Sequence, residues 1–180
     1  MKGNHLVSTL RILGCLLALS LSACGIHPRG ETNLAPPLHH LYIQTTDPYG
    51  YLAKSLEQYF SLSKVKIVSS SNEATAILNI LHDTKSQVLL GVSSTQQTRQ
   101  YNLITTIEFS VTDPKGRILL PPYTLSDART ITVQSDQILG ASNETTLFYK
   151  LMQRTLAYAI INHLASQDAT RAITHAYHTP

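Results

Sequence analysis

The sequence has 180 residues, and its 14 lysines and arginines against 11 aspartates and glutamates give a formal net charge of +3. This near balance excludes a nucleic-acid-binding protein that depends on bulk positive charge, and the length suits one domain with a single core. The two cysteines are Cys15 and Cys24, so a zinc site built from several cysteines is excluded as well.

The amino terminus has the pattern of a secretory signal peptide that ends in a lipidation motif. A basic start with Lys2 and Arg11 precedes an apolar run of ten residues, Ile12 to Leu21, which ends in the motif Leu21-Ser22-Ala23-Cys24. The run is too short for a membrane-spanning helix, which needs about 20 residues. The motif resembles a bacterial lipobox, in which the cysteine thiol receives a diacylglycerol and becomes the first residue after cleavage. We therefore predict a lipoprotein signal peptide over residues 1–23 and lipidation of Cys24.

Cleavage before Cys24 leaves 157 residues with 12 basic and 11 acidic side chains, a net charge of +1. No disulfide can then form within the mature chain, because Cys15 is lost with the signal. No cofactor is expected apart from the covalent diacylglycerol and an N-acyl chain on Cys24, and several such chains hold a protein on a membrane almost permanently. Gly25 resembles the pattern of lipoproteins exported to the outer membrane, so we expect the domain on its periplasmic side.

The first half of the chain is predicted to contain a tether, two strands and one helix. Glycine and proline recur in residues 24–37, which are typical of a tether without regular structure. A strand is expected over residues 38–45. Asp47-Pro48 is a typical helix start, so a helix with one buried face is expected from about Tyr49 to Ser61. A short strand follows at residues 65–68.

The centre of the chain is predicted to consist of strands. The expected strands are residues 74–83, 87–93 and 99–112, and the last two flank an uncharged segment as in a long hairpin. Asp113-Pro114-Lys115-Gly116 has the pattern of a type I turn. The strand that begins at Arg117 contains Pro121-Pro122, which places it at a sheet edge or a bulge before it resumes towards Val133.

A long amphipathic helix from about Asn143 to Ser166 comes last. Residues 167–180 lose its periodicity and are predicted to be a flexible tail. Runs of strands flanked by helices favour an α+β fold. We expect a two-layer sandwich over residues 38–166, with two helices packed on one face of a mainly antiparallel sheet of four to six strands.

The sequence gives little support to an enzyme or a metal site. The Gly-x-Ser-x-Gly, Gly-x-Gly-x-x-Gly, Walker and His-Glu-x-x-His patterns do not occur. The adjacent His39 and His40 would point to opposite faces of a strand and could not bind one metal together. Glu108 is the one acid in a strongly apolar strand, and a place on the open face of the sheet explains it more simply than catalysis.

Several basic residues lie at strand ends or near turns, among them Lys85, Arg99, Arg117 and Arg129. One interpretation is scattered surface charge. The other is a set of cations that hold the phosphates of an anionic lipid, a role for which the planar guanidinium of arginine is suited. Lys85 and Arg99 flank the two legs of the predicted hairpin, but their register cannot be derived from the sequence.

A series of short motifs then follows one another along the chain. They are Cys24-Gly25-Ile26-His27-Pro28-Arg29-Gly30, Leu41-Tyr42-Ile43, Gln100-Tyr101-Asn102-Leu103, Asp113 to Gly116, Arg129, Gln137-Ile138-Leu139 and Asn143-Glu144. In order and spacing this series resembles the LptE family of lipopolysaccharide-assembly lipoproteins. The resemblance covers the mature domain except for its tail.

This resemblance implies a non-enzymatic protein with two helices on a four-stranded sheet. It implies a heterodimer in which the protein plugs the lumen of the LptD β-barrel, helps that barrel mature, and contacts lipopolysaccharide through basic residues near the hairpin tip and before the last helix. Residues 93–98 and 140–142 carry no charge here, so Lys85, Arg99 and Arg129 become the candidate lipopolysaccharide-binding residues. The alternatives are an accessory lipoprotein of another periplasmic lipid-trafficking system and an envelope hydrolase with a dispersed site.

Overall fold

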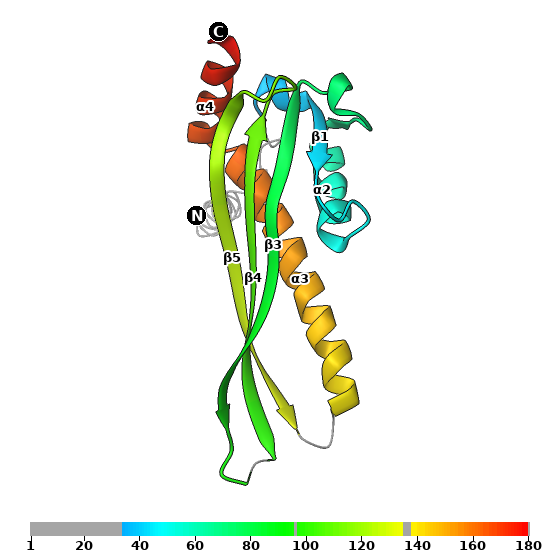
Figure 1. The fold of residues 1–180 in the computed structure, drawn as a ribbon, viewed down its shortest axis with the longest axis vertical. Helices are drawn as coiled ribbons and strands as arrows, with labels where there is room; N and C mark the ends of the chain where they lie inside the picture. Colours follow the sequence, from blue (N-terminus) through cyan, green and yellow to red (C-terminus); the bar gives the residue numbers. More distant parts are fainter. Residues whose placement is uncertain (1–33, 96, 135–137, 180) are drawn as a thin grey trace, which may run out of the picture. The chain divides into compact units, whose positions relative to one another are not determined.

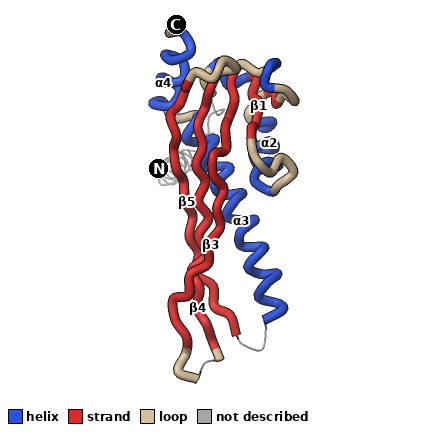
Figure 2. The backbone as a smooth tube through the Cα atoms, viewed as in Figure 1, coloured by secondary structure: helices blue, strands red, loops and turns tan. Residues whose placement is uncertain are grey.

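Three long strands form the centre of the computed structural model, which describes residues 34–95, 97–134 and 138–179 (Figures 1 and 2). They are β3, Ala76–Val92, β4, Thr98–Thr112, and β5, Ile118–Gln134. The short strands β1, His40–Gln44, and β2, Lys66–Ile67, complete a sheet in the order β2-β1-β3-β4-β5. The helices are η1, Pro36–His39, α2, Tyr51–Leu62, η2, Ser71–Glu73, α3, Ile138–Leu164, and α4, Gln167–His178.

The predicted α+β class is confirmed, and the sheet is mixed. Strands β3, β4 and β5 are antiparallel to one another and make up most of the sheet. Strand β1 is parallel to both β2 and β3. The parallel pair β1–β2 arises because the chain leaves β1, passes through α2 and re-enters the sheet in the same direction, which is the usual connection between parallel strands.

The main core lies between one face of the sheet and the helices α2, α3 and α4 (Figure 1). Phe60 of α2, Phe109 of β4, Ile160 of α3 and Ile173 of α4 are all fully buried in it. The apolar side chains on one side of each helix therefore pack against the inward-facing residues of β4 in one layer. The helical period of 3.6 residues and the strand period of two predict this arrangement. Within the described residues, none of the helices has both the length and the hydropathy of a membrane span.

Strand β3 joins two segments that the sequence predicts as separate strands, residues 74–83 and 87–93. The polar residues between them continue the pairing with β4 instead of forming a loop. The register shifts between Ile80 and His82 and again between Leu89 and Gly91. A bulge adds one unpaired residue and so reverses which residues face the helices. This reversal explains why a single alternating pattern is not visible along β3 in the sequence.

Strand β5 is an edge strand that carries Pro121-Pro122, so the predicted edge position is confirmed. It runs through the two prolines without a break. The pairing with β4 shifts at this point, since Phe109 is opposite Tyr123 and Val111 is opposite Leu120. The irregular register accommodates residues that cannot donate a ladder hydrogen bond.

Helix α2 begins at Tyr51 with Gly50 as its N-cap, two residues later than the sequence predicts. Asp47 does not cap the helix through its side chain. Its carboxylate instead fills the space beside Gly50, where an added Cβ would lie 2.3 Å from an Asp47 oxygen. Glycine therefore allows the turn between β1 and α2 to close tightly.

The prediction of a flexible tail is wrong for Gln167–His178, which form α4. The Ser166 side chain caps the helix by accepting a hydrogen bond from the Ala169 N–H. At its other end the Arg117 guanidinium donates to the carbonyl oxygens of Tyr177 and Thr179. A cation at the carboxyl end of a helix satisfies its last carbonyls and favours its dipole. The stabilising partner thus comes from the β4–β5 turn, far away in the sequence.

Asp113 holds Arg117 in place, and its loss is expected to destabilise α4. Asp113 is buried, with 4% of the residue exposed. Its carboxylate accepts from the backbone N–H groups of Lys115 and Arg117 and pairs with the Arg117 Nε at 3.1 Å. Burial alone would raise the Asp113 pKa, but these hydrogen bonds outweigh burial and leave the pKa below its ordinary value. We expect Asp113→Ala to cost about 2–3 kcal/mol of unfolding free energy, measured by urea denaturation, with faster amide exchange in α4. Unchanged exchange in α4 would contradict this.

His163 is expected to make the fold less stable in acid. Its ring stacks on that of Tyr123 with the ring centroids 3.9 Å apart, and it is nearly perpendicular to the ring of Phe109, with centroids 5.9 Å apart. Burial lowers the His163 pKa below 6.5, so the unfolded chain binds a proton before the folded one does, and stability falls as the pH drops below about 6.5. Thermal denaturation should show a smaller loss of stability between pH 7.5 and 5.5 in His163→Asn. An equal loss in the variant would assign the effect to other groups.

Candidate functional site

The three candidate basic residues share the helix-covered face of the sheet. Lys85 pairs with Thr105 and Arg129 pairs with Leu103, and both partners are fully buried beneath α3. Directly opposed residues of an antiparallel pair point to the same side, so Lys85 and Arg129 point to the side of α3. Arg99 has the same parity on β4 as Leu103 and belongs to this face as well.

The register nevertheless separates these residues. Arg99 is opposite Val92, which lies seven residues beyond Lys85 along β3. At about 3.3 Å per residue this is a separation of roughly 23 Å. Lys85 and Arg99 therefore belong to two different sites. Cys24, the predicted lipidation site, lies outside the described residues.

Arg129 lies on the edge strand β5, across α3 from Lys85. Its Nε is 3.4 Å from the Asp127 carboxylate, and 40% of its side chain is exposed. A partly exposed pair of this kind contributes little stability, so the guanidinium can exchange its carboxylate partner for a phosphate at small cost. Arg129 is thus an accessible cation but is not part of a cavity.

Arg99 borders a hollow of about 410 Å³ at the end of the β3–β4 hairpin. The hollow is lined by Leu89, Val92, Ser93, Ser94, Arg99 and Tyr101. The neighbouring Val88 and Leu90 are 48% and 55% exposed, and Leu89 and Val92 are 52% and 47% exposed. A single cation beside exposed apolar side chains and hydroxyl groups suits an amphiphile with an anionic head group.

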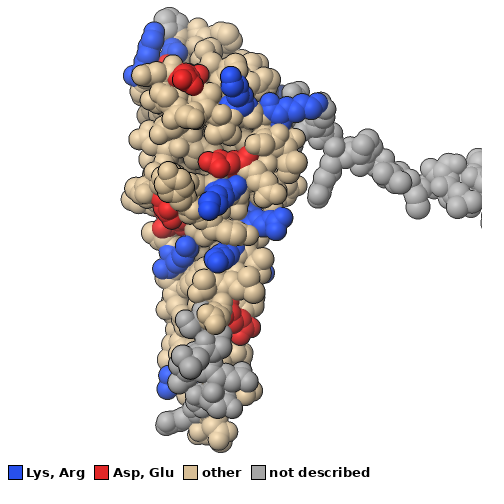
Figure 3. Space-filling view, turned by 90° about the vertical axis from the view of Figure 1, so that its right-hand side faces the viewer, with Lys and Arg blue, Asp and Glu red and all other residues tan. Residues whose placement is uncertain are grey.

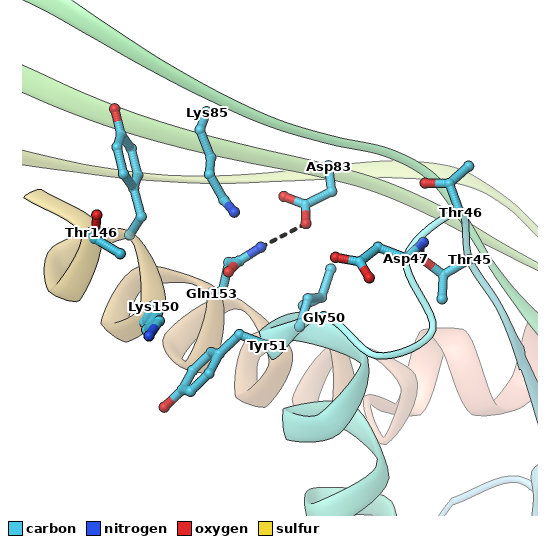
Figure 4. Close-up of a pocket in the computed structure, with 12 residues that line it drawn as sticks. Thr45, Thr46, Asp47, Gly50, Tyr51, Asp83, Lys85, Thr146, Lys150 and Gln153 are labelled. Carbon is cyan, nitrogen blue, oxygen red and sulfur yellow. Dashed lines mark hydrogen bonds between the residues drawn. The ribbon is translucent and has the colours of Figure 1, made fainter.

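Lys85 borders a larger groove of about 510 Å³ between the β1–α2 loop, β3 and α3 (Figure 4). Strand β1 ends at Gln44, opposite Asn79, and the chain then turns away through Thr45 to Gly50. Strand β3 continues without a second strand neighbour among the described residues, while α3 packs on β4 and β5. The groove is the space left where these three elements separate.

The walls of the groove are polar and are held by hydrogen bonds. The Gln153 amide donates to the Asp83 carboxylate at 2.6 Å, and Gln153 is 4% exposed. The Tyr149 hydroxyl donates to the Ser86 carbonyl at 2.8 Å, and burial raises the Tyr149 pKa. In Figure 4 the side chains of Lys85, Asp83 and Gln153 point toward one another across the groove. These groups can bind a polar ligand by hydrogen bonds and charge.

Sequence reasoning missed most of this groove. Tyr149 and Gln153 lie four residues apart on α3, so the helical period could have placed them on one side. The bulge near Ile80 hid the fact that Asp83 and Lys85 face α3. The position of the β1–α2 loop against β3 depends on the parallel pairing of β1, for which the sequence carries no signal.

Charges of both signs are interspersed on the face that Figure 3 draws, and no broad patch of one sign is visible there. Within the described ranges, no three histidine, cysteine, aspartate or glutamate side chains are arranged to hold a metal ion. Glu108 lies on the open face of the sheet, where His82 is 3.6 Å away. With charges distributed in this way this face has no strong electrostatic potential of one sign. A binding partner would therefore contact it through complementary shape and dispersed polar groups.

Comparisons with known proteins agree on one family. The sequence profile described as "LptE: Lipopolysaccharide-assembly" matches residues 38–164. The chain is 25% identical over 171 residues to the LPS-assembly lipoprotein LptE of Pectobacterium atrosepticum, an alignment that covers 94% of this chain and 91% of that protein. It is 29% identical over 111 residues to the LPS-assembly lipoprotein LptE of Photorhabdus laumondii, covering 60% of this chain and 61% of that one.

Solved structures show the same fold. The crystal structure of the rare lipoprotein B from Shewanella oneidensis aligns with a TM-score of 0.63 and 26% identity, over 73% of this chain and 98% of that one. The solution structure of a lipoprotein B from Nitrosomonas europaea aligns with a TM-score of 0.65 and 21% identity, over 86% and 97%. At this identity the second likeness concerns the fold alone.

Proposed function

The chain belongs to the LptE family of lipopolysaccharide-assembly lipoproteins, and from this premise we propose that it plugs the lumen of the LptD β-barrel and assists the insertion of lipopolysaccharide at the outer membrane. Members of this family take part in lipopolysaccharide assembly and are not enzymes. The observation that carries the proposal is the match of the family profile over residues 38–164, which includes the whole described sheet and both α2 and α3.

The open face of the sheet supports a role as a plug. Thr84, Thr106 and Ser126 lie side by side across β3, β4 and β5 on the face away from the helices, with the Thr106 and Ser126 hydroxyls 3.1 Å apart. Thr130 and Thr132 continue this face along β5 and are exposed. A surface of hydroxyl groups with few charges is suited to hydrogen bonding with the polar interior of a large barrel.

Lipid attachment is the second part of the proposal. Acyl chains on Cys24 would hold the protein on the periplasmic side of the outer membrane, with Gly25 as the export signal. The predicted tether, residues 24–37, is too long at its carboxyl end, because Leu34 and Ala35 are buried in the main core and η1 begins at Pro36. The described helices offer no alternative anchor across a membrane.

Co-purification of the native protein from solubilised outer membranes tests the plug role. We expect a large β-barrel to be recovered with the protein in equal amounts, and we expect depletion of the protein to lower the lipopolysaccharide exposed at the cell exterior. If no barrel accompanies the protein, the plug role is excluded. The accessory role in another lipid-trafficking system would then be favoured if a periplasmic transport component is recovered instead.

Arg99 and Arg129 are expected to contribute to lipopolysaccharide binding, Arg99 at the hairpin hollow and Arg129 at the edge of the sheet. The double variant Arg99→Ala/Arg129→Ala should bind lipopolysaccharide about tenfold more weakly, because each guanidinium can form charge-assisted hydrogen bonds with phosphate. The control is Lys66→Ala/Arg171→Ala, which removes two exposed positive charges elsewhere. Equal binding by both double variants at matched ionic strength would show that neither arginine is a specific contact.

A further inference from the structure

The groove beside Lys85 has the size and rigidity of a small-ligand site. Its volume of about 510 Å³ lies within the range of about 300–1,000 Å³ that is usual for such sites. Gln153 is buried and fixes the Asp83 carboxylate through a 2.6 Å hydrogen bond. The ring of Tyr149 is fixed on α3 by the bond of its hydroxyl to Ser86. Binding groups that are already positioned lose little entropy when a ligand arrives.

Two lysines line the groove, Lys85 on β3 and Lys150 on α3. Neither is within ion-pair distance of a carboxylate in the described part of the chain, although Lys85 points toward Asp83. Figure 4 shows the two lysines on the side of Thr146, whereas Asp83 and Asp47 lie towards the β1–α2 loop. Two lysines from different elements that line one groove can both donate hydrogen bonds to a phosphate bound there.

The other end of the groove offers groups that bind hydroxyls. Asp47 and Asp83 provide carboxylate oxygens, and the Thr45 and Thr46 side chains line the same end. Carboxylates accept hydrogen bonds from hydroxyl groups, and threonine hydroxyls both donate and accept. Tyr149 adds an aromatic ring at the lysine end, which can pack against the apolar face of a ring-shaped ligand.

We propose that this groove binds a phosphorylated saccharide, with Lys85 and Lys150 on the phosphate and Asp47 and Asp83 on the sugar hydroxyls. The site is separate from the hairpin hollow, since Lys85 lies about 23 Å from the Arg99 position along β3. The choice of ligand rests on the proposed function, because lipopolysaccharide carries a phosphorylated saccharide. The groove should therefore bind that saccharide after the acyl chains have been removed.

The test uses the full-length protein, purified in detergent and titrated calorimetrically. The probe is the acyl-free, phosphorylated core oligosaccharide released from lipopolysaccharide, compared with the same oligosaccharide after phosphatase treatment and with inorganic phosphate. We expect the phosphorylated oligosaccharide to bind at least tenfold more tightly than either of the others. If inorganic phosphate binds as tightly as the phosphorylated oligosaccharide, the groove is a simple anion site and the proposal is wrong. The proposal is also wrong if the oligosaccharide does not bind.

Paired variants locate the binding. Lys85→Gln/Lys150→Gln should weaken oligosaccharide binding at least tenfold, whereas Lys66→Gln/Lys115→Gln removes the same charge from exposed positions outside the groove and should leave binding unchanged. Asp83→Asn keeps the shape of the side chain, and it should weaken binding of the oligosaccharide without weakening that of inorganic phosphate. If both lysine pairs have the same effect, the oligosaccharide is held by general charge and the assignment to the groove is wrong.

The outcomes also separate this proposal from the plug role. A protein that co-purifies with a barrel but binds no acyl-free oligosaccharide retains the proposed function and loses the saccharide site. A protein that binds the oligosaccharide through Lys85 and Lys150 but recovers no barrel retains the site and loses the plug role. Equal melting temperatures of the variants and the native protein show that a loss of binding does not reflect unfolding.

Discussion

Replacing Cys24 with serine is expected to move the protein from the membrane fraction to the soluble periplasmic fraction. A serine cannot form the thioether through which the proposed diacylglycerol would be attached, and each buried CH₂ of an acyl chain is worth about 0.8 kcal/mol of membrane affinity. The loss of two or more chains therefore removes nearly all of the anchoring free energy. Fractionation under conditions that dissociate protein complexes measures the effect, because a barrel partner could otherwise retain the unlipidated chain.

Cys15→Ser is the matched control, since it changes the other cysteine of the predicted signal peptide and leaves the predicted lipobox intact. This variant should remain in the membrane fraction. Mass spectrometry of the native protein should show a mature amino terminus at Cys24 that carries a diacylglycerol and an N-acyl chain. An unmodified amino terminus at another residue would exclude the lipoprotein assignment.

Phe109→Ala is expected to destabilise the fold more than Asp113→Ala does. Phe109 is fully buried in the main core, where its ring lies 6.0 Å from Tyr123 and 5.9 Å from His163. Removing a buried phenylalanine typically costs about 3–5 kcal/mol through lost transfer free energy and the cavity that remains. Small domains have only about 5–15 kcal/mol of stability, so the variant should be largely unfolded at moderate urea concentrations.

Val88→Ala provides the comparison for Phe109→Ala. Val88 lies on β3 and is 48% exposed, so its truncation should change the unfolding free energy by less than about 0.5 kcal/mol. Urea denaturation followed by circular dichroism gives both values. A loss below about 1.5 kcal/mol for Phe109→Ala would mean that the sheet and α3 are not packed as described.

The parts of the fold that the sequence predicts well depend on local chemistry. The β4 boundaries agree within one residue, because apolar and polar residues alternate without interruption up to the turn at Asp113. Pro121-Pro122 predict an edge position or a bulge for β5, and the strand has both, an edge position and a shifted register at the prolines. The long helix also agrees at its carboxyl end within two residues, although it begins earlier, at Ile138.

The parts that the sequence does not predict depend on distant partners. Helix α4 buries only Ala169 and Ile173, and its carboxyl end is held by Arg117, about 60 residues earlier. The parallel pairing of β1 likewise has no local signal. For the same reason the sequence suggests Lys85, Arg99 and Arg129 as separate cations but cannot assign Lys85 to a groove with Gln153 and Lys150, since that requires the register of β3 and the path of α3.

The uneven lengths of β1 and β3 have a consequence for the living cell. Beyond Asn79, β3 has a strand neighbour on one side only within the described residues, and its last part exposes Val88, Leu89 and Leu90. Unpaired backbone N–H and C=O groups beside exposed apolar side chains favour strand pairing between identical molecules, and hence aggregation. Unassembled copies of the protein are therefore expected to aggregate, and the partner proposed above would prevent this by covering the exposed strand.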